Sequence, residues 1–130
     1  MTDAAIGQEI SRAEWPRFLD EFSRAHAGWL VTVEERDPGR GPRELAREVP
    51  LSGISAELSR GEPRDVTVIA GSGDVEWTHR IEAPARLRVH RTPEGAEEGI
   101  ETESAVGKRT LIRFRSAVLP ETVDGMLPEL

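Results

Sequence analysis

Apolar residues recur at helical spacing near the start of the chain, and charged residues fill most of the positions between them. Four of them share one face of a helical projection: Trp15, Phe18, Leu19 and Phe22. This pattern is typical of an amphipathic helix that buries one face. Ser11 and Glu14 match a capping box, and Gly28 is a natural helix stop. We therefore predict a helix over residues 12–27, preceded by a flexible N-terminus over residues 1–10.

After this helix the period changes, because from Trp29 onward apolar and polar residues alternate. Alternation predicts strands. The pattern continues through a series of short segments: residues 29–34, 46–59, 65–70, 75–82, 85–90, 100–104 and 109–114. The stretch 35–44 is charged and rich in Gly and Pro, so we predict a mobile loop there. Short strands joined by turns, with no helix between them, indicate a mainly β (α+β) fold, in which the N-terminal helix is followed by a small antiparallel β-barrel of five to seven strands.

One strand changes phase in its middle, at Gly53. Val49 and Leu51 share one parity, whereas Ile54 begins the opposite one. A phase change at glycine is what a β-bulge or sharp bend produces. We predict that Leu51 and Ile54 are both buried despite their opposite parity, and that the bent strand belongs to two halves of the barrel.

A chain of 130 residues favours one domain with one core. We place this domain at residues 11–114, with the barrel at 29–114 and a C-terminal tail at 115–130. The chain has no cysteine, which excludes a disulfide scaffold, a cysteine nucleophile and a cysteine-containing zinc site. No apolar run approaches the roughly 18 residues of a membrane span, and no signal peptide opens the sequence. We expect a cytoplasmic protein without a membrane partner.

Charge argues against nucleic acid as the partner. The chain has 17 basic and 24 acidic residues, a formal net charge of −7. Arg88 and Arg113 lie at outward positions of two predicted strands, and Glu101 and Glu103 lie at outward positions of the strand between them. We predict that Arg–Glu–Arg pairs across the strands neutralise this basic stripe.

Candidate catalytic and metal-binding residues are scarce. The three histidines, His26, His79 and His90, lack the short spacing that brings metal ligands together. No nucleophile elbow or Ser-His-Asp set is recognisable, so we assign no catalytic residue, metal or cofactor. His79 lies at an inward position between Trp77 and Ile81. It is predicted to be either a buried neutral histidine with a lowered pKa or, with Trp29 and Trp77, part of a ligand-binding pocket.

Several blocks of the sequence together resemble a known family. They are residues 12–24, His26, residues 28–34, 51–57, 79–81 with Pro84, 101–104 and 111–114. The chain from Ile10 to Phe114 resembles an uncharacterised family of short bacterial proteins, catalogued as a domain of unknown function. The resemblance implies a small cytoplasmic bacterial protein and no particular activity. In outline, a helix followed by a bent-strand barrel is also similar to Sm-like and other SH3-like small barrels.

These observations favour a non-catalytic binding or assembly module. Its partner is expected to be another protein or a second copy of the chain, paired through strand edges. The alternative is a small-molecule-binding barrel or an enzyme with a pocket near Trp29, Trp77 and His79. A third hypothesis, less favoured by the charge, is an RNA-binding Sm-like module.

Overall fold

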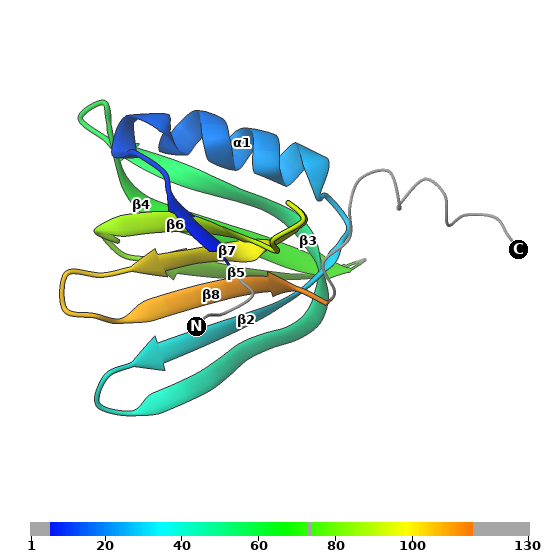
Figure 1. The fold of residues 1–130 in the computed structure, drawn as a ribbon. Helices are drawn as coiled ribbons and strands as arrows, with labels where there is room; N and C mark the ends of the chain where they lie inside the picture. The colour runs from blue at the N-terminus through cyan, green and yellow to red at the C-terminus, as the bar shows by residue number, and fades with distance from the viewer. Residues whose placement is uncertain (1–5, 73, 116–130) are drawn as a thin grey trace, which may run out of the picture.

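The computed structural model describes residues 6–72 and 74–115, so the predicted tail over 115–130 lies, apart from Arg115, outside the described residues. This described part of the chain forms eight strands, one 3-10 turn and one α-helix, arranged as Figure 1 shows. In chain order they are β1 (Ile6–Glu9), η1 (Arg12–Glu14), α1 (Trp15–Ala25), β2 (Leu30–Asp37), β3 (Gly41–Ser59), β4 (Glu62–Ser72), β5 (Val75–Ile81), β6 (Arg86–Arg91), β7 (Glu97–Glu103) and β8 (Arg109–Phe114).

All eight strands belong to one antiparallel sheet in the order β1-β6-β7-β8-β2-β3-β4-β5. The sheet is not closed, because β1 and β5 are its two ends and do not pair with each other in the described chain. The predicted barrel of five to seven strands is therefore not confirmed, since the sheet has eight strands in the described chain and stays open. Closure needs backbone pairing along both edges, whereas here a side chain bridges part of the gap. The Arg12 guanidinium donates to the carbonyl of Pro63 at 3.1 Å and to the carbonyls of Pro84 and Ala85 at 3.3 and 3.4 Å.

The ordered structure begins earlier than predicted. Residues 6–9, placed in a flexible N-terminus by the sequence, form β1, which pairs with β6. The segment predicted as a mobile loop at 35–44 is also mostly strand, because β2 extends to Asp37 and β3 starts at Gly41. Only the turn at residues 38–40 needs the Gly and Pro chemistry that suggested a loop.

The predicted bend at Gly53 is confirmed. The first part of β3 pairs with β2 and the second part with β4, and the β3–β4 register shifts between Leu51 and Gly53. Leu51 and Ile54 are each only 2% exposed. The bulge thus turns side chains of opposite parity toward the same core, which lets one long strand serve both parts of the curled sheet.

The helix is shorter than the predicted span 12–27. A 3-10 turn precedes it, Ser11 makes no side-chain capping bond, and His26 is the residue at its end. The capping-box prediction is therefore wrong. The predicted apolar face is correct, since its large side chains are buried or partly buried against the strands. We call the sheet face that packs on α1 the inner face; its buried apolar residues include Val31, Val33, Leu51, Ile54, Val66, Val68, Leu87, Val89, Ile100 and Ile112.

Candidate functional site

Among the described residues, strand β1 has one edge without a partner strand, and this edge lies beside α1. The Ile10 amide donates to the Leu87 carbonyl at 2.8 Å, so the backbone at Ile10 points toward β6. Because backbone direction alternates along an antiparallel strand, the N–H and C=O groups of Gly7 and Glu9 point away from β6. Both residues are exposed. The edge therefore offers backbone donors and acceptors to an incoming strand.

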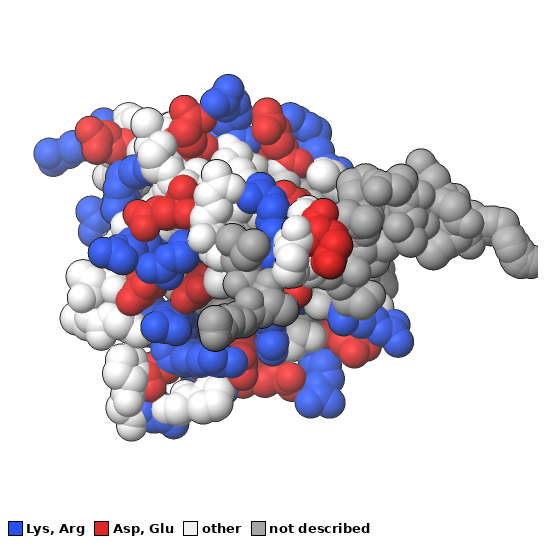
Figure 2. All heavy atoms as spheres, viewed as in Figure 1, with Lys and Arg blue, Asp and Glu red and all other residues white. Residues whose placement is uncertain are grey.

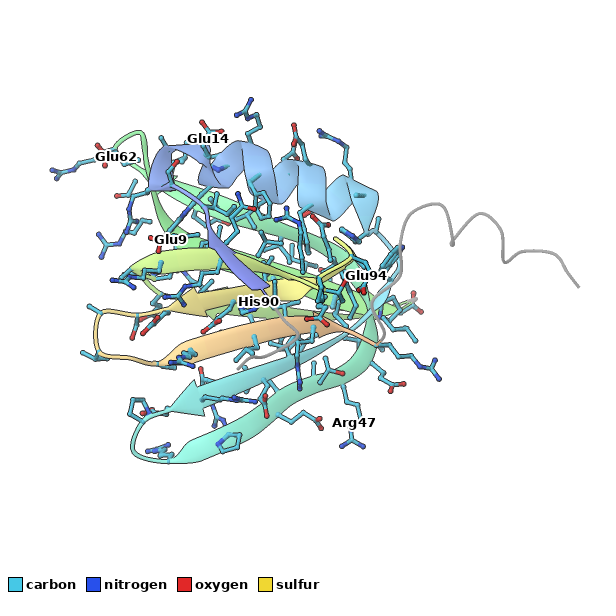
Figure 3. All side chains as sticks on the ribbon, viewed as in Figure 1. Glu9, Glu14, Arg47, Glu62, His90 and Glu94 are labelled. Carbon is cyan, nitrogen blue, oxygen red and sulfur yellow. The ribbon has the colours of Figure 1, made fainter. Side chains whose placement is uncertain are left out.

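A hollow of about 400 Å³ lies between this edge and α1. We call it the β1–α1 groove; it is lined by Gln8, Glu9, Ile10, Ser11, Glu14, Arg17, Phe18 and Glu21. Its apolar contacts come from Ile10 and Phe18, which are partly buried against the core. Figure 3 shows Glu9 and Glu14 near the N-terminal end of α1. The groove combines an apolar floor with an acidic rim.

The charge of the rim is only partly neutralised. Arg17 pairs with Glu14 one helical turn away. Among the described residues, Glu9 and Glu21 make no ion pair. The groove therefore presents two carboxylates to which a cationic side chain of a ligand could bind.

Trp29, a predicted ligand-binding residue, packs at the helix-covered end of the inner face. Its ring lies 4.6 Å from that of His26 and 4.9 Å from that of Phe114. His26 is buried; its Nδ1–H donates to the Phe22 carbonyl at 2.8 Å, and its Nε2 lies 3.3 Å from a carboxylate oxygen of Glu97. These contacts give Trp29 and His26 a packing role between α1 and the sheet.

Trp77 and His79, the other two predicted residues, stack on each other along β5. Their ring centroids are 5.8 Å apart with an interplanar angle of 11°. Burial lowers the pKa of His79, and the charge of Glu35 only partly opposes this effect. The direction of this shift agrees with the prediction. The predicted full burial of His79 is wrong, because His79 and its neighbour Trp77 are both only half-buried at the edge of the sheet. None of the aromatic contacts in the described chain joins this pair to Trp29, and a ligand at Trp77 and His79 stays a prediction.

A buried carboxylate near His79 was missed by the sequence analysis. Glu35 follows Val31 and Val33 at the same parity on β2 and is 8% exposed. Its oxygens lie 2.9 Å from Arg43 and 3.1 Å from Lys108. Burial would raise the pKa of Glu35, but the hydrogen bonds and charges of Lys108 and Arg43 outweigh it and hold that pKa below its ordinary value. Glu35 is therefore a fixed negative charge at neutral pH and a poor proton donor or acceptor.

The predicted neutralisation of the basic stripe is confirmed in part on the outer face of the sheet, with Arg109 in the place predicted for Arg113. Glu101 lies 3.6 Å from Arg88 and 3.5 Å from Arg109. His90 donates to Glu101 at 2.7 Å, and this hydrogen bond is the main reason why the pKa of Glu101 is lowered. Arg113, predicted to take part, instead lies 3.5 Å from Glu34. Figure 2 shows acidic and basic side chains interspersed over the visible face.

The described residues contain neither a metal-binding cluster nor a helix that could span a membrane. No group of three or more His, Asp or Glu side chains is placed there to hold a metal ion. The single α-helix found there is too short and too polar to cross a membrane.

The fold defines a mainly β protein: within residues 6–72 and 74–115, an open eight-stranded antiparallel sheet packs one face on α1. The sequence profile described as "Family of unknown function (DUF5335)" matches residues 6–122, and the chain belongs to this family. This match confirms the resemblance to a family of unknown function. No match to a curated protein or to a solved structure was found.

Proposed function

We propose that the protein is a non-catalytic binding module of the cytoplasm, and that its β1–α1 groove binds an extended segment of a partner protein. The observation that carries this proposal is the position of the free β1 edge directly beside an apolar floor with an acidic rim. An edge of this kind supplies backbone affinity, and the side chains next to it supply selectivity.

The partner segment would lie along β1 as an additional strand. Its backbone would exchange hydrogen bonds with Gly7 and Glu9, whose polar groups point outward. Alternate side chains of the segment would face α1, where Ile10 and Phe18 favour apolar groups. Lysine or arginine at the other positions would meet the rim carboxylates. The expected ligand is therefore a short extended segment of alternating apolar and cationic residues.

A capped six-residue peptide of alternating lysine and valine is a direct probe. In an NMR titration we expect the largest amide shifts at Gly7, Glu9 and Phe18. Glu9→Lys combined with Glu21→Lys should weaken binding about ten-fold, because reversing two exposed charges removes roughly 1–2 kcal/mol of attraction. The matched control is Glu57→Lys combined with Glu94→Lys, which changes net charge equally at exposed sites outside the groove.

Equal affinity of the groove variant and the control variant would refute the proposal, because the attraction would then be due to net charge alone. Shifts confined to residues outside the groove would refute it as well. A peptide of alternating glutamate and valine should bind more weakly than the lysine peptide. If both peptides bind equally, the acidic rim does not select the ligand.

A further inference from the structure

At the other end of the sheet, β5 also has an edge that no described strand pairs with. The hydrogen bonds of Ile54 show how the backbone of β5 is oriented. The Ile54 amide donates to Ser23 Oγ at 2.8 Å, and that hydroxyl donates to the Ile54 carbonyl at 2.9 Å. Ile54 therefore forms no backbone hydrogen bonds with Val68, its register partner on β4. The backbone of Val68 then points toward His79 on β5.

Alternation along β5 places the remaining backbone groups on the open side. Because the backbone groups of His79 point toward β4, those of Glu76, Thr78 and Arg80 point to the free edge. All three residues are exposed. The β5 edge thus has three alternate residues whose backbone N–H and C=O groups can hydrogen-bond to another strand.

The sequence of β5, VEWTHRI, is self-complementary about its central residue. If two copies run antiparallel with a two-fold axis at Thr78, each residue meets a partner of suitable chemistry. Glu76 would lie opposite Arg80, Trp77 opposite His79, and Val75 opposite Ile81, each pair joining the two copies. Acid would meet base on the outer face, and aromatic and aliphatic groups would meet their like on the inner face.

This edge also lacks several of the features that usually prevent strands from pairing, and its charged residues, Glu76 and Arg80, are of opposite sign. Exposed edges are commonly protected by proline, lysine, bulges or short length. β5 has seven residues without Pro or Lys, and its register with β4 shows no shift. Val75, at one end, is a large apolar residue that is 73% exposed. By contrast, β1 has four residues and a helix beside it.

We propose that β5 pairs antiparallel with β5 of a second copy of this chain, with the two-fold axis at Thr78, so that two eight-stranded sheets become continuous. The surface differs from the β1–α1 groove, so this inference does not rest on the proposed function. Arg80 already donates to Asp65 at 2.8 Å. Its guanidinium carries five N–H donors, which leaves donors for Glu76 of the partner subunit. Val75 would be covered by Ile81 of the partner subunit.

A single cysteine tests the axis, because the chain has none of its own. In a hydrogen-bonded antiparallel pair, the two residues at the axis have Cα atoms about 5.5 Å apart, within the range of a disulfide. Thr78→Cys should therefore form a disulfide-linked dimer under mild oxidation. Glu76→Cys is the matched control on the same strand, since its two copies would be about 13 Å apart along the strands.

We expect cross-linking of Thr78→Cys to be at least ten times faster than that of Glu76→Cys, measured by non-reducing gels at 0.1–1 mM protein. Equal rates, or no cross-link at these concentrations, would overturn the two-fold register. Glu9→Lys combined with Glu21→Lys should leave the cross-linking of Thr78→Cys unchanged, which separates this interface from the groove.

A charge exchange tests the pairs beside the axis. Wild-type protein should show a mass rising from 14.4 kDa toward twice that value with concentration in sedimentation. Glu76→Arg places like charges opposite Arg80 and should abolish the rise. Mixing Glu76→Arg with Arg80→Glu should restore it, because each junction then joins opposite charges. Unchanged self-association of Glu76→Arg would contradict the proposal. Arg80→Glu loses its bond to Asp65, so circular dichroism checks that this variant is folded. If it is not, the comparison of Thr78→Cys with Glu76→Cys tests the proposal alone.

Discussion

The inner face of the sheet has two ends that are stabilised in different ways. At the helix-covered end, Phe22 stacks on Phe114 with ring centroids 5.6 Å apart, and both side chains are buried. At the other end, buried Glu35 lies between Arg43 and Lys108, and the charges of all three residues affect the pKa of His79. The contrast shows that the same alternating pattern yields an apolar core where a helix covers the face and an ion cluster where none does.

This difference also separates rigid packing from surfaces available for binding. Residues at the helix-covered end have their polar groups satisfied within the chain, as Ser23 and Ile54 illustrate. At the charged end, Trp77 and His79 remain partly exposed, and the outer edge of their strand has no partner among the strands that the structure describes. Substitutions at the two ends should therefore differ in size and in their dependence on pH.

The largest effect is expected at the helix-covered end. Phe22→Ala removes a ring that contacts Phe18, His26 and Phe114. A large-to-small change at such a site should lower the free energy of unfolding by about 3–5 kcal/mol. Urea denaturation measures this loss, and Arg24→Ala on the exposed side of the helix is the control. A loss below about 1 kcal/mol would show that the helix contributes little to the core.

An intermediate effect is expected at the charged end. Glu35→Gln keeps the shape but removes the charge that Arg43 and Lys108 neutralise. Because both cations remain partly in water, we expect a loss on the order of 1 kcal/mol at pH 7. The lowered pKa of Glu35 means that its contribution exists above the ordinary glutamate value and disappears as the pH falls through the lowered one. Wild type and variant should therefore converge in urea melts as the pH falls below the lowered pKa, and a constant difference would contradict this assignment.

The smallest effect, but one with a distinct pH dependence, is expected at His79. Burial lowers its pKa, so below about 6.5 the unfolded chain binds a proton that the folded chain resists. Stability contributed by neutral His79 is complete above that pH and decreases as the pH falls toward the lowered value. His79→Gln should flatten the change in melting temperature between pH 7 and pH 5. NMR titration of the His79 ring measures the pKa directly, and an ordinary histidine pKa would show that His79 is not the source of the pH dependence.

The comparison of the two ends also shows where sequence-based prediction succeeded. Alternation placed Val31, Val33 and the residues around Gly53 correctly, because strand geometry fixes which side chains share a face. The same rule placed Glu35 on the inner face, yet its charge and the Gly- and Pro-rich stretch after it suggested a loop. Strand pairing with Arg43 reversed that expectation. Local composition was a poor guide because the stabilising partners are on other strands.

The sequence by itself determined the amphipathic helix, most of the strands, the bend at Gly53 and the family, since each depends on residues close together in the chain or on a linear pattern. Only the tertiary structure decided that the sheet of the described residues stays open, that Arg12 bridges part of the opening, and that β1 and β5 are the two end strands. The physical reason is that strand order and edge exposure arise from hydrogen bonds between distant segments. The self-complementary sequence of β5 is present in the linear chain, but it suggests an interface only because the fold places β5 at an end of the described sheet.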